Sequence, residues 1–399
     1  DNWRVMANKY LMRKVKIVKP AYEDEDILSL TVNGVIIRDL EAGGKMPTSF
    51  DGYQTLYPGN LLMCLFDYDV TPRCIGLIKN NGVTSPAYSQ FVMKGGNIPD
   101  YYYYYYLMVD HTKALLHLAK NLRHSFTEEQ LGMIDAPVPS IEEQKAIAAY
   151  LDRRCDEINA VTVDIQDQID ALEQYKRSVI TETVTKGLNP DAGMKDSGIQ
   201  WIGQMPAHWN CIRGKYILRY MQKPVKEDDG VITCFRDGEV TLRSNRREDG
   251  FTMSDKEIGY QGIDVGDLVV HGMDGFAGAI GISDSRGKAS PVLNVLGTDQ
   301  NKRYIMYYLR SMAYSDVFLA LATGIRVRSC DLRWNKLAEL MYPVPPIEEQ
   351  EKIVEHIDSV VNKTNEVIAD KKAQLDTIEE YKKSLIYEYV TGKKEVPVS

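Results

Sequence analysis

Arginine and asparagine gather in one short stretch of the chain, around Gly238 and Gly250. The cluster consists of Arg236, Arg243, Asn245, Arg246 and Arg247. Arginine can donate two hydrogen bonds to guanine, asparagine can pair with adenine, and both can contact phosphates. The flanking glycines favour a strand and a turn that would present these side chains. A solvated charged hairpin explains the pattern equally well, so both interpretations stay open.

Two further basic groups precede short helices that we expect near the end of each half of the chain. Arg326 and Arg328 follow Gly324, ahead of the last short helix of the second half. Arg123 and His124 hold a similar place in the first half. We weigh both groups evenly between nucleic-acid contacts and ordinary surface charge.

The first half offers a weaker pair of candidates for the same chemistry. Arg73 lies in a polar turn, and Lys79 precedes Asn80, Asn81 and Gly82. A hairpin turn alone is a sufficient explanation for the Asn-Gly pair. We therefore retain Arg73 and Lys79 as candidates and keep the structural interpretation beside them.

No motif for catalysis, metal binding or cofactor binding occurs in the sequence. The six cysteines include no C-x-x-C pair, and the six histidines include no H-E-x-x-H. No [N/D]-P-P-[Y/F] or Walker sequence occurs, and Gly43-Gly44-Lys45 lacks the upstream glycine of a phosphate loop. We expect a chain that is not an enzyme, with no metal and no cofactor of its own. Its cysteines are scattered at Cys64, Cys74, Cys155, Cys211, Cys234 and Cys330.

The pattern of cysteines and apolar residues favours the cytoplasm. Scattered cysteines fit reduced thiols. No apolar run approaches the roughly 18 residues that span a membrane. The start of the chain at Asp1 shows no secretory signal, and we expect a few native residues to precede it.

The net charge of −8 does not exclude a nucleic-acid partner. Phosphate binding needs lysine and arginine. The excess acid lies mainly in residues 137–200 and 343–399, whereas residues 1–136 and 201–342 are close to neutral. The two near-neutral segments can therefore still meet a polyanion.

An internal repeat organises the whole chain. The phrase from Pro137 to Gln144 recurs from Pro343 to Gln350, 206 positions later. From the start of this phrase through residues 185 and 391, about 22 of about 49 gapless positions are identical. Tyr-Lys-[Arg/Lys]-Ser also recurs, at 175–178 and 381–384. At the same displacement, Trp3, Lys9 and Tyr10 match Trp209, Lys215 and Tyr216.

The segments between these phrases have diverged but keep a common skeleton. Ser85-Pro86 corresponds to Ser290-Pro291, and we align Tyr105–Leu107 with Tyr307–Leu309. The chain is thus a tandem duplication of a variable segment followed by a constant segment.

The constant segments are predicted to be long helices. Neither glycine nor proline occurs within 141–186 or 347–391, and both stretches are bounded by such residues. Ser140 and Glu143 are spaced as a capping box at the first start. At about 1.5 Å per residue, each helix would be nearly 70 Å long, too long for the core of a neighbouring domain.

A heptad pattern along the first helix predicts an antiparallel coiled coil with the second. The expected packing residues are Leu151, Ile158, Ile165, Leu172 and Val179 in the first helix and Ile357, Ile378 and Leu385 in the second. Val161, Ile169 and Tyr175 are expected to fill the alternate positions of the seam. Thr364 and Lys371 interrupt the pattern in the second helix.

The variable segments are predicted to be α/β (α+β) domains in two copies. Short apolar stretches such as 60–65 and 267–270 are typical of strands. The tyrosine run 101–106 could be a low-complexity tract or a platform on which bases stack. We favour an ordinary amphipathic helix, because the corresponding stretch 303–309 has that pattern.

The arrangement resembles the specificity subunit of type I restriction-modification systems over essentially the whole chain. The resemblance is carried by the doubled P-V-P-x-I-E-E-Q phrase, the Tyr-Lys-[Arg/Lys]-Ser phrase, the approach 201–209 to the second variable segment and the Ser-Pro motif in each segment. The first segment lacks the W-I-G-x-x-P lead-in before Trp3, which departs from the pattern and fits trimming.

The resemblance implies two target-recognition domains, 1–136 and 201–342, each reading half of a split double-stranded DNA target. A central helix with its linker, 137–200, and a C-terminal helix, 343–399, would hold them in a pseudo-twofold arrangement and set the unread spacer. It also implies two modification subunits that bind S-adenosylmethionine, and two restriction subunits that use ATP and Mg²⁺. Two rival functions remain: an enzyme acting alone, and a coiled-coil adaptor that never reads DNA.

Overall fold

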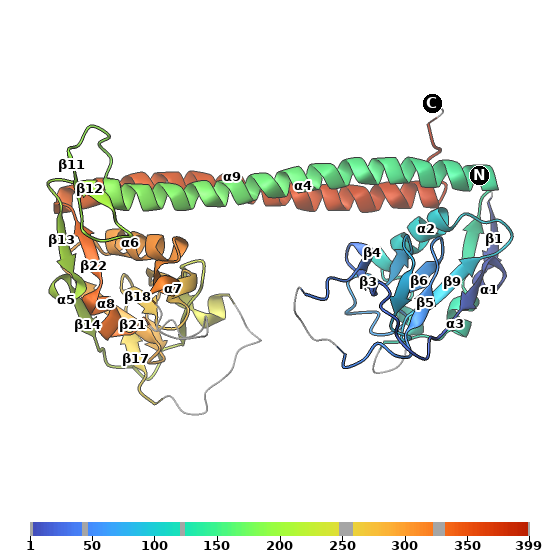
Figure 1. Ribbon diagram of the computed structural model, residues 1–399, viewed down its shortest axis with the longest axis horizontal. Helices are drawn as coiled ribbons and strands as arrows, with labels where there is room; N and C mark the ends of the chain where they lie inside the picture. The colour runs from blue at the N-terminus through green and yellow to red at the C-terminus, as the bar shows by residue number, and fades with distance from the viewer. Residues whose placement is uncertain (1–2, 42–46, 120–123, 247–257, 322–331, 398–399) are drawn as a thin grey trace. The chain divides into compact units, whose positions relative to one another are not determined.

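The protein forms two compact units, both crossed by a pair of long helices. The first unit comprises residues 1–166 and 372–399, and the second comprises 167–371. Helices α4 (Ile141–Lys186) and α9 (Ile347–Val390) each contribute one part to each unit, as Figure 1 shows. The computed structural model describes residues 3–41, 47–119, 124–246, 258–321 and 332–397.

The first unit contains a sheet domain that precedes α4. Its central sheet has the strand order β2-β9-β6-β7, and the pairs β1·β10, β3·β4 and β5·β8 accompany it. The strands are β1 Arg4–Ala7, β2 Met12–Val15, β3 Leu28–Thr31, β4 Gly34–Ile37, β5 Gln54–Leu56, β6 Leu61–Met63, β7 Ile75–Leu77, β8 Gly82–Thr84, β9 Ser89–Met93 and β10 Asp135–Val138. The helices are α1 Asn8–Leu11, α2 Pro99–His111, η1 Leu116–Leu118 and α3 Glu128–Gly132.

The second unit contains a sheet domain between α4 and α9, entered through the hairpin β11 (Met194–Asp196) and β12 (Gln204–Pro206). Its central sheet has the order β14-β21-β18-β19, accompanied by β13·β22, β15·β16 and β17·β20. The strands are β13 Asn210–Arg213, β14 Leu218–Met221, β15 Ile232–Cys234, β16 Val240–Leu242, β17 Gln261–Ile263, β18 Leu268–His271, β19 Ile280–Ile282, β20 Gly287–Ala289, β21 Leu293–Thr298 and β22 Met341–Val344. The helices are α5 Gly214–Ile217, η2 Arg243–Asn245, η3 Gly275–Ala277, α6 Lys302–Tyr314, α7 Val317–Ala320 and α8 Trp334–Glu339.

The two sheet domains share one strand order, so the duplication found in the sequence is also a duplication of the fold. Every ladder between the described strands of the two domains is antiparallel. This is the α+β form of the predicted fold class. The prediction of two such domains and two long antiparallel helices is confirmed.

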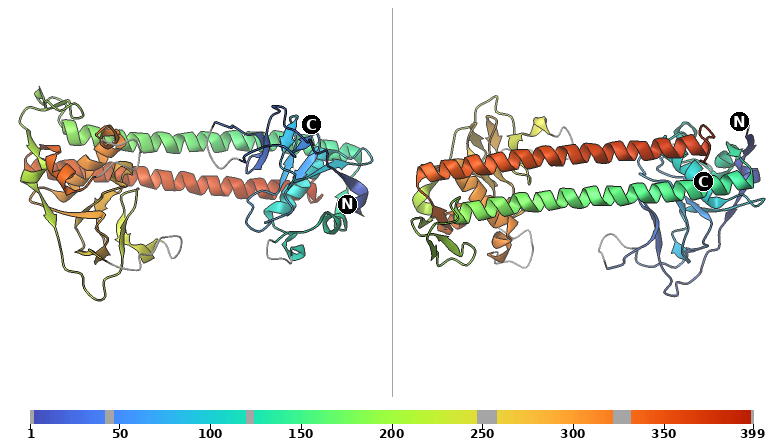
Figure 2. Two further views of the ribbon diagram at one scale, coloured as in Figure 1. Left: turned by 60° about the horizontal axis from the view of Figure 1, so that its bottom comes forward. Right: turned by 90° about the horizontal axis from the view of Figure 1, so that it is seen from above.

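The tyrosine run forms a helix, as favoured, and its rings belong to the core. In α2 the side chains of Tyr101, Tyr102, Tyr104 and Tyr106 are buried. Its counterpart α6 buries Tyr304, together with other aromatic and aliphatic side chains. Figures 1 and 2 place each of these helices between its own sheet and the long helices of the same unit.

The Asn-Gly pair at 81–82 does not form the hairpin turn that we expected. The strands on either side, β7 and β8, pair with β6 and β5 rather than with each other. A side chain at Gly82 would lie 2.4 Å from the carbonyl oxygen of Asp26, so close approach of the backbone explains this glycine.

Within the described ranges, no helix is both long and apolar enough to cross a membrane. The same part of the chain contains no group of three or more His, Cys, Asp or Glu side chains placed to hold a metal ion.

Candidate functional site

A buried glutamine explains the end of the P-x-x-E-E-Q phrase in both units. The Gln144 amide oxygen accepts a hydrogen bond from the backbone N–H of Ile98 (2.8 Å), and its nitrogen donates to the Pro139 carbonyl (3.0 Å). Gln350 makes the same contacts with the N–H of Asn301 (3.0 Å) and the carbonyl of Pro345 (2.9 Å). Each glutamine therefore fixes the start of the tyrosine helix to the start of the following long helix.

The glutamate before each glutamine holds the retained tryptophan. The Trp3 indole donates to Glu143 (3.2 Å), and the Trp209 indole donates to Glu349 (3.1 Å). Ser140 and Glu143 form the predicted capping box, and these hydrogen bonds lower the pKa of the Glu143 carboxyl.

A glycine beneath each tryptophan ends a long helix. Gly187 and Gly392 have positive φ angles of 74° and 69°, which suit a glycine after a helix C-terminus. A side chain at Gly187 would lie 3.1 Å from the Trp209 ring, and one at Gly392 would lie 3.0 Å from the Trp3 ring.

The tyrosine helices bind the long helices through their hydroxyl groups. Tyr101 donates to the carbonyl of Val390 (3.0 Å) and Tyr304 to the carbonyl of Val184 (3.1 Å), each near the C-terminus of a long helix. One turn further along α2 and α6, Tyr104 donates to Asp152 and Tyr307 donates to Asp358. Every sheet domain is thus attached to both long helices of its own unit.

These contacts correct our alignment of the tyrosine stretches by one residue. We paired Tyr105 with Tyr307, but Tyr104 and Tyr307 bind equivalent aspartates. Tyr105 and Tyr308 likewise bind the carbonyl groups of Asp135 and Met341, which are also equivalent. The displacement here is 203 positions, although it is 206 at both ends of the variable segments, so the loops before and after this helix differ in length in opposite directions.

The long helices are antiparallel in each unit and exchange reciprocal hydrogen bonds. In the first unit Lys382 donates to Asn159 (2.7 Å), and in the second Lys176 donates to Asn365 (2.9 Å). The lysines are equivalent in the duplication, and so are the asparagines. Figure 2 shows the two helices side by side within each unit.

The structure buries most of the predicted packing residues of the helix pair but only part of the alternate seam. The fully or nearly buried members are Leu151, Ile158, Ile165, Ile357 and Leu385. Leu172, Val179 and Ile378 are half-buried, and Ile169 is buried. Val161 and Tyr175 are exposed, so their assignment to the seam is wrong.

In the second domain the arginine-asparagine cluster occupies the turn between β15 and β16, which contains Arg236, and the residues that follow β16. Arg243 and Asn245 lie in η2, where their side chains bind the hydroxyls of Thr233 (3.3 Å) and Thr241 (2.8 Å). Arg246 lies over the Phe235 ring, 4.1 Å from its centroid. These contacts order the side chains of the cluster on one edge of the domain.

Carboxylates accompany two of the arginines in this cluster. Arg236 is exposed and pairs with Asp274 (2.8 Å). Arg246 pairs with Asp237 (2.8 Å) and Glu239 (2.9 Å). Arg247 lies outside the described residues, as do Arg326, Arg328 and Arg123.

Sequence reasoning missed an arginine-tyrosine chain that joins this region to the long helix. Arg310 of α6 donates to the carbonyl of Asp237 (2.7 Å) and to the hydroxyl of Tyr314 (2.8 Å). The Tyr314 ring also lies beneath Arg177 of α4, 5.3 Å from its guanidinium. No sequence motif marks these residues, because they come from three separate elements.

The first-domain candidates differ in how the fold uses them. The Arg73 guanidinium donates to the carbonyls of Ile75 (3.1 Å) and Val32 (2.7 Å) and also contacts Tyr103. Its donors are therefore largely occupied within the domain. Lys79 is exposed, and His124 lies beside Asp69 with a positive φ angle of 41°.

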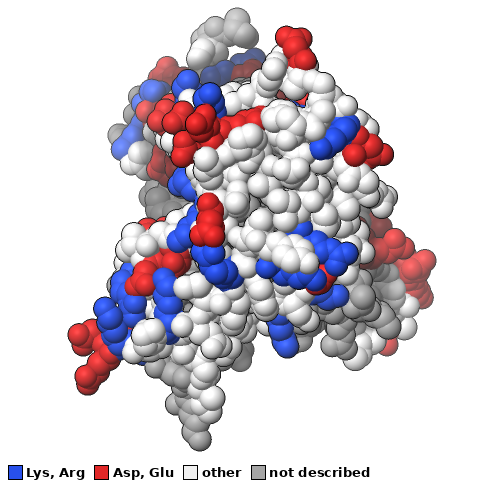
Figure 3. All heavy atoms as spheres, turned by 90° about the vertical axis from the view of Figure 1, so that its left-hand side faces the viewer, with Lys and Arg blue, Asp and Glu red and all other residues white. Residues whose placement is uncertain are grey.

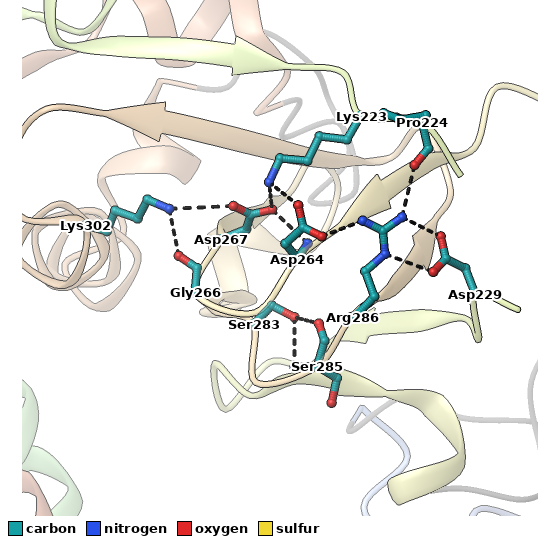
Figure 4. A network of polar contacts seen from close by, with 10 residues as sticks. All are labelled: Lys223, Pro224, Asp229, Asp264, Gly266, Asp267, Ser283, Ser285, Arg286 and Lys302. Atoms are coloured by element: carbon teal, nitrogen blue, oxygen red, sulfur yellow. Dashed lines mark hydrogen bonds and ion pairs between the residues drawn. The ribbon is translucent and has the colours of Figure 1, made fainter. Parts of the chain in front are cut away.

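A separate network of hydrogen bonds and ion pairs in the second domain engages several basic side chains, as Figure 4 shows. Arg286 binds the Asp229 carboxylate through two hydrogen bonds (2.8 and 2.9 Å) and also contacts Asp264. Lys223 binds both Asp264 (2.8 Å) and Asp267 (2.6 Å). Lys223 and Arg286 lower the pKa of the Asp264 carboxyl to about 2. The network ties together the segments before β15, before β18 and before β20.

Charges of both signs are mixed elsewhere as well. On the face drawn in Figure 3, lysine and arginine side chains are interspersed with aspartate and glutamate. The availability of a lysine or arginine side chain to a ligand therefore depends on whether a nearby carboxylate pairs with it, and not on the number of such cations.

Known proteins resemble this chain in both sequence and fold. The MjaX type I restriction enzyme specificity subunit of Methanocaldococcus jannaschii is 25% identical over 283 residues, 67% of this chain and 61% of that protein. The MjaVIII specificity subunit of the same organism is 24% identical over 277 residues, 65% and 62% of the two chains. The chain thus spans about six tenths of the length of these relatives. No protein-family model matches it.

A solved structure supports the same resemblance at the level of the fold. It concerns complex assembly and conformational transition of the type I restriction-modification system, and one of its chains superposes with a TM-score of 0.67. The superposition covers 97% of both chains at 13% identity. The resemblance to type I specificity subunits that the repeated phrases indicated is confirmed.

Proposed function

We propose that this chain is the DNA-recognition subunit of a type I restriction-modification complex. The observation that carries the proposal is the form of the duplication. The two long helices and their attachments to the sheet domains, which we call the frame, are retained in both copies. The exposed residues of the sheet domains, which we call the heads, have diverged. The glutamine, glutamate and tyrosine contacts that attach each sheet domain to the long helices occur twice. The exposed cluster after β16 has no counterpart of the same sequence in the first domain. Such a frame suits two domains that read different halves of one target.

We propose that the domains 1–136 and 201–342 each read one half-site of double-stranded DNA. In the second domain Arg236, Arg243 and Asn245 are the best candidates for base contacts, because hydrogen bonds order their side chains in the β15–β16 turn and directly after β16. Arg246 pairs with Asp237 and Glu239 and remains a candidate within the same proposal. The candidates Arg247, Arg326, Arg328 and Arg123 belong to the same proposal.

For the first domain, the exposed Lys79 and His124, which lies beside Asp69, stay candidates for contacts with DNA. Arg73 has its guanidinium engaged by two carbonyl oxygens and Tyr103, so we propose that it positions the β7 region rather than reading a base.

The helix pair, in segments 137–200 and 343–399, would set the spacer and dock two modification subunits. Val161 and Val367 are equivalent and exposed, and so are Tyr175 and Tyr381. Exposure to solvent alone does not explain why valine and tyrosine are retained at equivalent positions of both long helices. One protein partner that docks twice accounts for their retention.

The chemistry would reside on those partners, in the cytoplasm. The modification subunits would bind S-adenosylmethionine and methylate adenine, and two restriction subunits would use ATP and Mg²⁺ to move and cut DNA. This chain would then be non-catalytic.

Two rival functions make different predictions. An enzyme acting alone would methylate or cut DNA as a purified chain. A coiled-coil adaptor would join proteins without reading DNA, although such a spacer gives no reason for two divergent heads. Selection from a random DNA pool separates the adaptor from our proposal, since only a reader enriches a split motif.

The decisive experiment is methylome sequencing of cells that express this chain with its modification subunit. We expect methylated adenine in a two-part motif with a fixed unread gap. In the same assay the double variant Arg236→Ala/Arg243→Ala should lose discrimination in one half-site only, whereas the exposed helix variant Lys363→Ala should not. Absence of new methylation, with both proteins expressed and associated, would favour the adaptor.

A further inference from the structure

A lysine-tyrosine pair is identical at equivalent positions of the two sheet domains, although most other residues of these domains differ. Lys9 and Tyr10 lie in α1, and Lys215 and Tyr216 lie in α5. Both helices have four residues and join the outer strand pair of a domain to its central sheet. The third retained residue, at the second position of the next strand, is Arg13 in one copy and Arg219 in the other.

The packing of the domains does not explain this retention. The Tyr10 side chain is 62% exposed and the Tyr216 side chain 74% exposed. By contrast, the retained Trp209 is fully buried, and the retained Leu131 lies in a core. An exposed tyrosine is replaceable at little cost in stability, so its presence in both copies requires another cause.

Charge around the pair argues against a phosphate ligand. In the second domain Glu339 pairs with both Lys215 (3.0 Å) and Arg213 (2.9 Å). The Arg219 guanidinium is engaged by Asp299 through two hydrogen bonds of 2.7 and 2.8 Å. DNA-backbone contacts depend on cations that can neutralise phosphates, and here nearby carboxylates already neutralise them.

The remaining feature is an aromatic ring held outward beneath an ammonium group. The Lys9 nitrogen lies 5.1 Å from the centroid of the Tyr10 ring, and the Lys215 nitrogen lies 5.5 Å from that of Tyr216. Tyrosine is over-represented among the residues that dominate protein-protein binding energy. A cation over one face also restrains the ring, which lowers the entropy lost on binding.

A groove beside the first pair offers room for side chains of a partner. It has a volume of about 460 Å³ and runs between β2, β9 and α3. Its apolar walls include Met12, Phe91 and Leu131, and Lys9 and Met133 lie at its edge. Lys9 contacts the sulfur of Met133 at 3.7 Å, so the groove adjoins the lysine-tyrosine pair.

We infer that each lysine-tyrosine pair is a docking point for one modification subunit, separate from the helix faces described above. This inference rests on the proposed function. What is common to the two domains is the partner, not the half-site, so residues that bind the partner are retained while residues that read bases diverge. The partner surface would present an apolar socket for the tyrosine ring and a hydrogen-bond acceptor for its hydroxyl.

The test measures assembly of the full-length chain with its purified modification subunit by native mass spectrometry and titration. Tyr10→Ala should weaken binding of one subunit at least tenfold and leave mainly a one-to-one complex. Tyr10→Ala/Tyr216→Ala should weaken both. Tyr10→Phe keeps the ring and should bind much more like the wild type. The control is Tyr57→Ala, an exposed first-domain tyrosine that the duplication has not retained.

The outcomes separate this inference from the proposed function. If the wild-type chain fails to bind the modification subunit, the proposed function is wrong and the inference falls with it. If the wild type binds two subunits and the double variant binds them equally well, only the inference is wrong. Unchanged assembly with weaker binding to random-sequence DNA would identify the pair as a backbone contact and would also overturn the inference. Equal melting temperatures for all variants show that the fold is retained.

Discussion

At the scale of single residues, the retained phrases are explained by hydrogen bonds that lie far apart in the sequence. Gln144 and Gln350 are fully buried, and each satisfies backbone groups of the segment that begins a tyrosine helix. A buried amide contributes little net energy when satisfied, but its loss leaves its partners unpaired. This asymmetry explains why the last letter of the phrase is the same in both copies.

Replacement of Gln144 by leucine should therefore destabilise the first unit. Gln144→Leu leaves the N–H of Ile98 and the carbonyl of Pro139 without their partner, at a cost of about 2 kcal/mol. Urea unfolding of the full chain measures this loss. Gln174→Leu, at an exposed position of α4, is the control and should change stability by less than about 0.5 kcal/mol. Equal effects of the two variants would contradict the role given to Gln144.

The charge network of the second domain predicts a pH-dependent difference. Arg286 lowers the pKa of the buried Asp229 carboxyl, and Lys223 with Arg286 lowers that of Asp264 to about 2. Because these folded-state pKa values lie below the unfolded ones, the stabilisation is present above about pH 4 and is lost as the pH falls toward 2. Arg286→Met should lower the free energy of unfolding at pH 7, because it leaves the Asp229 carboxylate without its arginine partner.

The difference in free energy of unfolding between wild type and Arg286→Met should become smaller as the pH falls from 4 to 2, because the carboxyls become protonated. Denaturant unfolding at several pH values measures it. The exposed pair Arg219–Asp299 provides the control, and Arg219→Met should change the free energy of unfolding much less than Arg286→Met does at pH 7. A gap independent of pH would show that Arg286 acts by packing alone.

At the scale of elements, the sequence predicted the long helices well because their boundaries are local. Ser140 with Glu143 at one end and Gly187 at the other mark α4 without any tertiary information. The packing residues between the two helices were less predictable, because the register in which the helices pair decides which apolar residues face the other helix. Val161 and Tyr175 are apolar at plausible heptad positions and are nevertheless exposed.

The tyrosine helices and the basic residues show a second limit of sequence reasoning. The α2 helix carries tyrosine on all sides, so its periodicity gave no register and our alignment was off by one. Arg73 and Lys79 look alike in the sequence as cations in polar turns. The fold occupies the donors of Arg73 and leaves Lys79 exposed, and only tertiary contacts distinguish the two.

A proline in the middle of α4 should break both the helix and its proposed docking role. Leu172→Pro removes a backbone hydrogen bond and clashes with the preceding turn, at a cost of about 3 kcal/mol or more. The site lies near the Lys176–Asn365 and Lys371–Gln168 contacts, which would be disturbed. Circular dichroism measures helix loss, and co-purification measures binding of the modification subunit. Leu172→Ala keeps the backbone and, at a half-buried position, should cost only about 1 kcal/mol. Normal assembly of Leu172→Pro would contradict the proposal.

At the scale of the whole molecule, the duplicated chain has one part that is retained in both copies and one part that differs between them. The attachments between sheet domains and long helices are the same in both units, down to equivalent lysine-asparagine pairs. The heads share a strand order but differ in their exposed side chains. We interpret the first part as the frame that fixes geometry and the second as the part that determines sequence preference.

The frame hypothesis predicts that helix length sets the unread gap of the target. Insertion of one heptad into α4 between Ala160 and Gln174, with one heptad at the equivalent place in α9, adds about 10 Å of helix. Seven residues are close to two full turns, so the packing faces are kept. At about 3.4 Å per base pair, the gap should lengthen by up to about three base pairs while both half-sites stay the same. Methylome sequencing reads both properties at once. A matched variant with two extra residues in each helix would rotate the packing faces by about 200° and should abolish assembly. If the heptad variant methylated different half-site bases, or the original gap, the helices would not act as a ruler.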